Sequence, residues 1–319
     1  MKKYNLSYHF SIKLRYGENP HQKGWAWREK TADSLAFFNF QQLQGKELSF
    51  NNYLDIDASV TTLTLIGQKN PSGVVIKHGN PCGASIDRDI NKAFIKAWNG
   101  DSLAAFGGIV AINRIVSSRL AKIMLANKRF FEVLVCPGIS KSARTTFSYK
   151  PNLRILVNSV LKKPVVDITH DIKKIRGGLL VQERDVYQLK DKDLKVMTKK
   201  KPTKKQVSDL IFAWKICQVS KANCIVLAKN KQLIASGVGQ QDRVRCTQLA
   251  VTKAGKRAKN TVVASDAFFP FPDGPTTLIN AGVKAIIQPG GSIRDQQAID
   301  VCDKNKVAMI FTGIRCFRH

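Results

Sequence analysis

No apolar run in this 319-residue sequence approaches the about 18 residues that a membrane-spanning helix needs. The first segment, MKKYNLSYHFSIKLRYG, also lacks the continuous apolar core of a secretory signal. Both absences argue against a membrane protein and against a secreted one. We therefore expect a cytoplasmic protein.

Paired cysteines are absent as well. The seven cysteines are scattered between Cys82 and Cys316, in an odd number and without a C-x-x-C pair. A disulfide framework would need an even set, and a zinc ribbon or thioredoxin-like site would need C-x-x-C. We expect these cysteines to act as small buried apolar side chains.

Acidic residues are scarce: 23 Asp and Glu stand against 52 Lys and Arg, a formal net charge of +29. Such an excess can attract nucleic acid. The basic residues are nevertheless spread along the chain, with one dense cluster from Lys199 to Lys205, and no zinc-finger, RNP or helix-turn-helix pattern accompanies them. The Lys-rich composition is also compatible with the codon usage of an AT-biased genome, and a basic surface would help to capture small polyanionic substrates. Nucleic-acid binding is the weaker alternative.

Apolar runs alternate with helix-like stretches in the first part of the chain. A helix is predicted over residues 90–100, where apolar side chains recur at helical spacing and Gly100 follows. Short β-branched runs predict strands in SGVVIKHG (72–79), AFGGIVAIN (105–113), FFEVLVCPG (130–138) and LRILVN (153–158). This alternation predicts a mostly parallel sheet flanked by helices.

A second unit begins near residue 200. Thr203 and Gln206 have the spacing of a helix capping box, and an apolar stripe follows from Val207 to Cys217. Strands are then predicted in ANCIVLAKN (222–230), VKAIIQPGG (283–291) and VAMIFTG (307–313). The order of strand, polar tip, Gly-rich turn and helix repeats, although no residue-level repeat is visible. We predict two similarly built α/β halves, residues 1–200 and 201–319.

Lys77 and His78 end the first predicted strand, directly before a tight turn at Gly79. On residues alone, two interpretations stay open: a strand that enters solvent, or a general base beside a cation at the rim of the sheet. Ligands of open α/β sheets bind beyond the strand ends, so the number of polar tips favours the second. The other tips are Phe106–Gly108, Glu132, Asn223, Gly237–Arg243, Pro289–Ser292 and Arg315.

Three kinds of catalytic site lack their motifs. A zinc deaminase needs H-x-E and P-C-x-x-C, but Ser85 stands in the last position after Cys82, and no Glu follows His78 at the required spacing. There is no P-loop and no G-x-S-x-G elbow. We therefore expect acid–base and electrostatic catalysis without a metal.

Two loops have the composition of a phosphate site. They are RYGENPHQ (15–22) and Gly290–Ser292, where an Arg fork and glycine-turn N–H groups suit oxyanions. The alternative for both is an ordinary surface loop.

Eight motifs occur in a fixed order: LRYGENPHQ, KHGNPCGA, DSLAAFGGIVAIN, GGLLVQ, GVGQQDRV, SDAFFPFPDG, IQPGGSIRD and FTGIRCFRH. From about residue 5 to the C-terminus they closely resemble the transformylase domain of the AICAR transformylase/IMP cyclohydrolase family. The resemblance implies an α/β fold of two cytidine-deaminase-like, three-layer α/β/α subdomains without a zinc site. It also implies formyl transfer from 10-formyltetrahydrofolate to the amino group of AICAR, in a homodimer with active sites at the subunit interface.

The resemblance also implies roles for single residues. His78 would be the general base that takes a proton from the AICAR amine, and Lys77 would stabilise the anionic transition state or help the folate nitrogen leave. The nucleotide would be surrounded by Arg15, Tyr16, Gly107, Glu132, Asn223, Arg243, Phe268 and Arg315. The folate would contact Phe106, Val244, Asp273, Ser292 and Ile293, with Phe106 either packed on the pterin or part of the core.

Chemistry suggests finer roles within the nucleotide set. Arg15 and Arg243 suit the phosphate, Glu132 the ribose hydroxyls, and Asn223 the carboxamide. These assignments follow from the functional groups of the side chains.

Some features depart from the family pattern. Pro272 stands where many relatives carry Arg, and Cys316 where His or Leu is common. Some relatives bind potassium near the segment before Asn223, but Ala222 and Cys224 do not support that ion in this chain.

The cyclohydrolase domain that normally comes first is missing from this sequence. This leaves open an isolated domain, a reduced protein, or half of a split enzyme with a separate IMP cyclohydrolase. Ring closure to IMP is therefore not expected from this chain. The alternative function is a catalytically retired module that binds a nucleotide or a partner protein.

Overall fold

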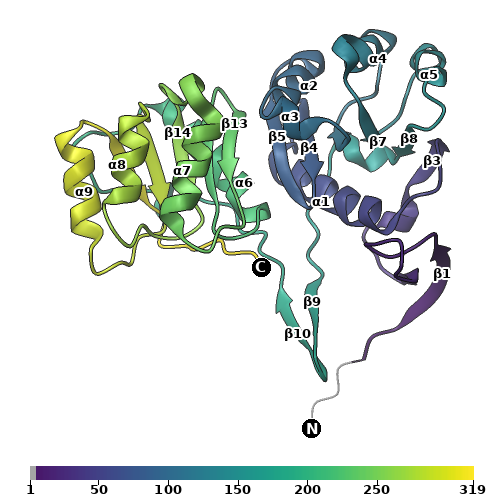
Figure 1. Cartoon of the computed structure of the whole chain (residues 1–319), viewed down its shortest axis with the longest axis horizontal. Coiled ribbons are helices and arrows are strands. Elements are labelled where there is room, and N and C mark those ends of the chain that lie inside the picture. Colours follow the sequence, from purple (N-terminus) through teal and green to yellow (C-terminus); the bar gives the residue numbers. More distant parts are fainter. Residues whose placement is uncertain (1–4) are drawn as a thin grey trace.

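The computed structural model describes residues 5–319. They form one large sheet, which is covered by helices, and two hairpins that are separate from this sheet (Figure 1). The large sheet has the spatial order β11-β16-β15-β14-β12-β13-β5-β4-β6-β7-β8-β3. Its strands are β3 Gln41–Gln44, β4 Ser72–Lys77, β5 Asn80–Ile86, β6 Gly108–Ile112, β7 Phe131–Cys136, β8 Arg154–Val157, β11 Lys195–Val196, β12 Ile225–Lys229, β13 Gln232–Gly237, β14 Val262–Ser265, β15 Ala285–Gln288 and β16 Ala308–Phe311.

The helices and the two separate hairpins complete the fold. The α-helices are α1 Phe50–Ile66, α2 Ile90–Trp98, α3 Ser102–Ala105, α4 Ser118–Leu125, α5 Lys141–Ser148, α6 Lys204–Val219, α7 Arg243–Ala254, α8 Asp273–Asn280 and α9 Asp295–Lys304. The hairpins pair β1 Tyr8–Leu14 with β2 Gly24–Glu29, and β9 His170–Ile175 with β10 Gly178–Glu183. Within residues 5–319, no helix is both long and apolar enough to cross a membrane.

The sheet consists of two halves with the same topology. The first half has the strand order β5-β4-β6-β7-β8-β3, and the second half has the matching order β13-β12-β14-β15-β16-β11. Strand β5 lies antiparallel to β13 at the centre, with Gln232 paired to Ser85. The repeated order that the sequence predicted is therefore present as a repeated topology, with the two halves joined edge to edge.

A residue-level repeat also exists, although the sequence was expected to lack one. Helix α1 begins at a capping box of Ser49 and Asn52, and α6 begins at one of Thr203 and Gln206, as predicted for α6. The sixth residue of α1 is Asp55, and the sixth residue of α6 is Asp209. The shared pattern is Ser or Thr, Asn or Gln, then Asp at intervals of three, followed later by a tight hairpin.

The prediction of a mostly parallel sheet is wrong. Only β6/β7, β7/β8, β14/β15 and β15/β16 are parallel; the other neighbouring pairs are antiparallel. A helix was predicted to follow the turn after Lys77, but the chain makes a two-residue hairpin there and returns as β5. This strand was not predicted because it contains Pro81 and Gly83, and both residue types are depleted in strands.

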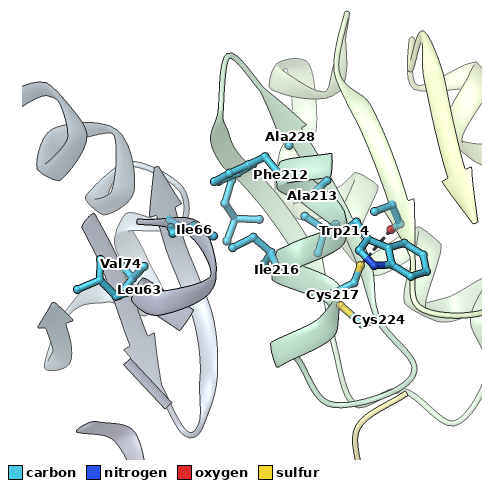
Figure 2. Close-up of a cluster of buried hydrophobic side chains, with 14 of the residues drawn as sticks. Leu63, Ile66, Val74, Phe212, Ala213, Trp214, Ile216, Cys217, Cys224 and Ala228 are labelled. Atoms are coloured by element: carbon cyan, nitrogen blue, oxygen red, sulfur yellow. Dashed lines mark hydrogen bonds between the residues drawn. The ribbon is translucent and has the colours of Figure 1, made fainter. Parts of the chain in front are cut away.

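Helices α1 and α6 cover one face of the sheet together and form a shared core. Leu63 and Ile66 of α1 and Phe212 and Ile216 of α6 belong to one buried cluster (Figure 2). Each such side chain contributes about 1.5–3 kcal/mol when it is fully removed from water. A hydrogen bond also links the two helices, because Lys215 Nζ of α6 donates to the Leu65 carbonyl of α1 at 2.9 Å. The two halves are thereby joined by packing as well as by the sheet.

Two further clusters lie away from this shared core. One contains buried side chains of α2, α4 and α5, and the other contains side chains of α7, α8 and α9. The protein therefore has three layers, with the sheet in the middle.

Candidate active site

The Lys77–His78 pair lies at the hairpin between β4 and β5. Lys77 is half-buried, and its Nζ donates to the Phe106 carbonyl at 2.5 Å. His78 is exposed and has φ 54°, and Gly79 has φ 71°. Positive φ at both central residues is typical of the type I′ turn that joins hairpin strands. The ammonium is thus fixed toward the Phe106–Gly107 turn, and the imidazole residue stands at the tip.

The carboxylate of Asp55, on α1, accepts hydrogen bonds from the backbone of this hairpin tip. His78 N donates to Asp55 Oδ2 at 3.3 Å, and Gly79 N donates to Asp55 Oδ1 at 2.6 Å. Cys82, on the returning strand, is a protonated thiol, because burial raises its pKa to about 12. The Cys82 thiol donates to the Val75 carbonyl at 3.4 Å.

Arg15, Tyr16 and Glu132 come together at one cavity of about 640 Å³. Arg15 follows β1, and its guanidinium lies 5.6 Å from the ring centre of Tyr16. Glu132 Oε2 accepts from Asn52 Nδ2 at 3.3 Å and lies 3.8 Å from Arg154 Nη1. The cavity also receives four basic residues that the sequence analysis missed, namely Lys46, Arg129, Lys150 and Arg154.

This excess of cations over one carboxylate makes the cavity suitable for an anion. A single sequence with 52 Lys and Arg offers no signal that would single these four out. Asp55 does have a sequence signal, because the spacing of Ser49, Asn52 and Asp55 recurs as Thr203, Gln206 and Asp209.

Phe106 and Gly107 link the cavity to the hairpin. Gly107 N donates to the Phe130 carbonyl at 2.8 Å, and Phe130 lines the cavity. Phe106 is 55% exposed, and its ring centre lies 5.3 Å from that of Phe130. This exposure removes the core alternative for Phe106 and leaves an open aromatic surface beside Lys77.

Asn223, Arg243 and Asp266 form a buried polar network in the second half. Arg243 Nη1 donates to Asp266 Oδ1 at 2.6 Å and to Ser265 Oγ at 2.9 Å. Arg243 Nη2 donates to Asn223 Oδ1 at 2.7 Å, and Asn223 Nδ2 donates to the Gln240 carbonyl at 2.7 Å. Burial raises the pKa of Asp266, and the Arg243 guanidinium opposes that rise. Most of the polar groups that were predicted to bind phosphate and carboxamide are thus already engaged with protein atoms.

Arg315 lies beside this network. The guanidinium carbon of Arg315 lies 4.7 Å from the ring centre of Phe317, and that of Arg243 lies 5.9 Å from it. Arg315 is exposed and lines a separate cavity of about 300 Å³. It therefore keeps a charge that a ligand can reach.

The remaining predicted contacts follow strand ends in the second half. Val244 is the second residue of α7, Asp273 begins α8, and Ser292 and Ile293 precede α9. Ile293 is 98% exposed, whereas Phe268, on the loop after β14, is 38% exposed. Next to Pro272, Arg294 stacks on the Phe271 ring at 4.5 Å.

In the glycine loop before α9, two of the N–H groups predicted for a phosphate site are already used. Gly291 N and Ser292 N both donate to Asp295 Oδ2, at 2.7 and 3.1 Å. The protein's own carboxylate occupies the place of the anion. In the RYGENPHQ loop, Gly17 N likewise donates to the Gln22 carbonyl at 2.7 Å and is not available to an anion.

The two groups of residues lie on the same edge of the sheet. Antiparallel pairing places the end of β4 at the starts of β5 and β6, and it places the end of β13 at the start of β12. Since β5 and β13 are also antiparallel, the His78 hairpin and the Asn223–Arg243 network share an edge. A direct link confirms this, because Lys221 N donates to Asn80 Oδ1 at 3.0 Å.

We call this edge the site edge and the opposite one the far edge. The first half contributes amino ends of its parallel strands to the site edge, and the second half contributes carboxyl ends. Three of the residues predicted as strand tips lie at strand starts and not at strand exits: Gly107 before β6, Glu132 in β7 and Asn223 before β12. Within residues 5–319, no group of three or more His, Cys, Asp or Glu side chains is arranged to hold a metal ion.

Comparison with known proteins gives a consistent result. Residues 1–253 match the model of the AICARFT/IMPCHase bienzyme family. The chain is 45% identical over 314 residues to the bifunctional purine biosynthesis protein PurH of Thermoanaerobacter sp. strain X514, covering 98% of this chain and 60% of that protein. PurH of Acetivibrio thermocellus is 44% identical, with 96% of this chain and 59% of that protein covered. PurH of Ruminiclostridium cellulolyticum is 41% identical, with 99% and 60% covered. The chain therefore spans about 60% of the length of these relatives.

Proposed function

The chain belongs to the AICARFT/IMPCHase bienzyme family, and from this membership we propose that it is an AICAR transformylase. The reaction would transfer a formyl group from 10-formyltetrahydrofolate to the 5-amino group of AICAR and release formyl-AICAR and tetrahydrofolate. The observation that carries the proposal is the site edge, where the Lys77–His78 hairpin, the cation-rich cavity and the second-half network meet. As a step of purine synthesis, the reaction is proposed to take place in the cytoplasm.

His78 would act as the general base. The AICAR amine is conjugated with a carboxamide and is a weak nucleophile, so it must lose a proton as it attacks the formyl carbon. A neutral imidazole can accept that proton near neutral pH, and positioned proton transfer contributes about 10²–10⁴-fold in rate. The exposed place of His78 at the hairpin tip gives both substrates access to it.

Lys77 would stabilise the oxyanion that develops on the formyl group. Its ammonium is held by the Phe106 carbonyl, so it needs little reorganisation during the reaction. When the intermediate collapses, the bond to the folate nitrogen breaks, and that nitrogen takes up a proton. Phe106, with its open ring face, would pack against the pterin.

The nucleotide would place its phosphate in the cation-rich cavity. Arg15 and Arg154 present guanidinium groups to the cavity, and Glu132 would accept from the ribose hydroxyls. Arg243 suits the phosphate less well than its charge alone suggests, since Asp266 and Asn223 already use much of its donor fork. Arg243 and Asn223 would bind through their remaining groups, with Gly107, Phe268 and Arg315 completing the nucleotide site.

The folate would extend along the second half, over Val244, Asp273, Ser292 and Ile293. Ile293 in particular is an exposed apolar side chain that a ligand could cover. We also propose that the two halves are cytidine-deaminase-like subdomains, divided near residue 200. Strand β11, which lies just before that boundary, already pairs with β16.

The protein is proposed to form a homodimer with its active sites at the subunit interface. The two separate hairpins support this, because both expose large apolar side chains. These are Phe10, Trp25 and Trp27 on β1 and β2, and Leu179 and Leu180 on β10. Covering such surface is a common reason for association.

A formyl-transfer assay tests the function. The protein should release tetrahydrofolate only when AICAR and 10-formyltetrahydrofolate are both present. His78→Ala should lower kcat by about 10²–10⁴-fold without unfolding the chain. Calorimetric binding of AICAR without turnover would instead support a retired binding module, and neither binding nor turnover would remove the proposal.

A further inference from the structure

The backbone of His78 is in a conformation that its side chain does not favour. A residue with a Cβ at φ 54° lies in the left-handed region, where Cβ crowds the following carbonyl. Residues in such conformations persist only when their surroundings enforce them, and they are common at functional sites. The structure therefore has to supply a group that holds His78 in place.

Asp55 is that group. A two-residue hairpin turn uses the N–H and C=O of its flanking residues, which leaves the two central N–H groups without ladder partners. The Asp55 carboxylate accepts from both of them, at 3.3 Å for His78 and 2.6 Å for Gly79. Hydrogen bonds to an ionised acceptor are among the stronger ones in proteins.

The first two turns of α1 also contact two other parts of the proposed site. Asn51 Nδ2 donates to the Glu18 carbonyl at 3.2 Å, in the loop that follows Arg15 and Tyr16. Asn52 Nδ2 donates to Glu132 at 3.3 Å. One helix end thus fixes the Arg15 loop, Glu132 and the His78 hairpin relative to one another.

We propose that Asp55 is a positioning residue for His78, acting through the backbone of the hairpin tip. This inference rests on the proposed function. When Asp55 is lost, His78 can relax to negative φ, which carries the imidazole away from the amine that it must deprotonate. The substrates would still bind, because Asp55 contributes no group to the nucleotide or folate contacts proposed above.

The second half supplies a matched control. Asp209 accepts from Asn230 N and Lys231 N, both at 2.8 Å, in the hairpin between β12 and β13. Asn230 and Lys231 have φ 54° and 52°, so the backbone of this hairpin matches that of the first. This hairpin lies on the far edge, however, and carries no proposed site residue. A purely structural role would make the two aspartates equivalent.

The experiment compares Asp55→Ala with Asp209→Ala in the full chain. Asp55→Ala should lower kcat by about 10–100-fold, because small misplacements of a catalytic group have effects of that size. KM for both substrates should stay near the wild-type value, and Asp55→Asn, which keeps one acceptor oxygen, should recover part of kcat. Asp209→Ala should leave kcat unchanged while it lowers the melting temperature about as much as Asp55→Ala does.

Equal losses of kcat in both alanine variants, or a rise in KM alone for Asp55→Ala, would overturn the inference. Amide hydrogen exchange by NMR provides a readout that does not need turnover. Exchange at His78 and Gly79 should accelerate in Asp55→Ala only, and exchange at Asn230 and Lys231 in Asp209→Ala only. An inactive wild-type protein would remove the proposed function, whereas unchanged exchange at His78 would remove the positioning role of Asp55.

Discussion

The His78 hairpin of the first half and the Asn230 hairpin of the second half have the same construction. In each, two residues with positive φ join neighbouring strands, and a carboxylate from the sixth residue of a capped helix accepts from both turn N–H groups. The two hairpins lie on opposite edges of the sheet, because β5 and β13 meet antiparallel. The difference teaches that the aspartate-held turn belongs to the scaffold, and that only the copy on the site edge carries an imidazole.

A second matched pair also differs between the two edges, but here the member on the site edge belongs to the second half of the sheet. Asn113 follows β6 on the far edge, and Asp266 follows β14 on the site edge. The neutral Asn113 amide donates to the Gly67 and Asn70 carbonyls at 2.6 and 2.8 Å and accepts from Ser72 N at 2.8 Å. Asp266 instead holds a buried guanidinium. In these two pairs, His78 with Asn230 and Asp266 with Asn113, the ionisable member lies on the site edge and the neutral amide lies on the far edge.

Exchanging His78 and Asn230 should have the largest effect. His78→Asn gives the first hairpin an Asn-Gly tip, the sequence that type I′ turns favour, so stability should be equal or higher. Formyl transfer should nevertheless fall by about 10²–10⁴-fold, because an amide cannot serve as the base. Steady-state kinetics and thermal unfolding of the same preparation measure both quantities.

The reciprocal variant Asn230→His is the control, and it should leave kcat unchanged. An active His78→Asn protein would show that the imidazole is not the base. A marked loss of activity in Asn230→His would show that the far edge takes part in the reaction.

Asp266→Asn should have the next largest effect, on stability. The change is nearly isosteric but leaves the Arg243 guanidinium, 7% exposed, without its charge partner. Breaking a buried ion pair in this way costs about 3–5 kcal/mol. Asn113→Ala on the far edge removes only neutral hydrogen bonds and should cost about 1–3 kcal/mol. Denaturant unfolding of both variants gives the comparison.

Replacing Arg243 by Met in the Asp266→Asn background should recover much of the loss, since no unpaired charge then remains buried. If Asp266→Asn is no less stable than Asn113→Ala, the two edges do not differ in the way that their charges suggest.

The elements that could be predicted from the sequence are those with local patterns. The helix after Thr203 and the strands ending at Lys77 and Lys229 are where apolar periodicity and capping placed them. The returning strands β5 and β13 were missed as such. At β5, Gly79 follows the polar tip, and a tight turn then looks like a helix entry. Sheet direction depends on that distinction, so the predicted parallel sheet was wrong.

The site was predictable only in part, for a similar reason. Arg15, Tyr16 and Glu132 were chosen by resemblance, and they line one cavity. The pairing of Arg243 with Asp266, and that of the Gly290–Ser292 loop with Asp295, depends on side chains that meet only in the folded chain. A positive charge or a glycine turn in a sequence does not show whether the protein already supplies its own anion.

The smallest effects should come from the second residue of each hairpin, Gly79 and Lys231. A Cβ at Gly79 would meet no atom within 4 Å, so Gly79→Ala introduces only backbone strain and should lower stability by about 1–2 kcal/mol. Lys231→Gly removes the same strain from the second hairpin, although the greater freedom of glycine in the unfolded chain offsets about 0.5–1 kcal/mol of the gain. The net result should be a small increase in stability, measured by equilibrium unfolding in denaturant.

Gly177→Ala is a suitable control, because Gly177 has φ 75° and open space around its Cβ position but lies in the separate β9–β10 hairpin. Opposite signs for Gly79→Ala and Lys231→Gly would show that the two tips share one backbone conformation; a loss in both would mean that Lys231 is held by contacts that Gly79 lacks, and the two halves would then differ in structure as well as in chemistry.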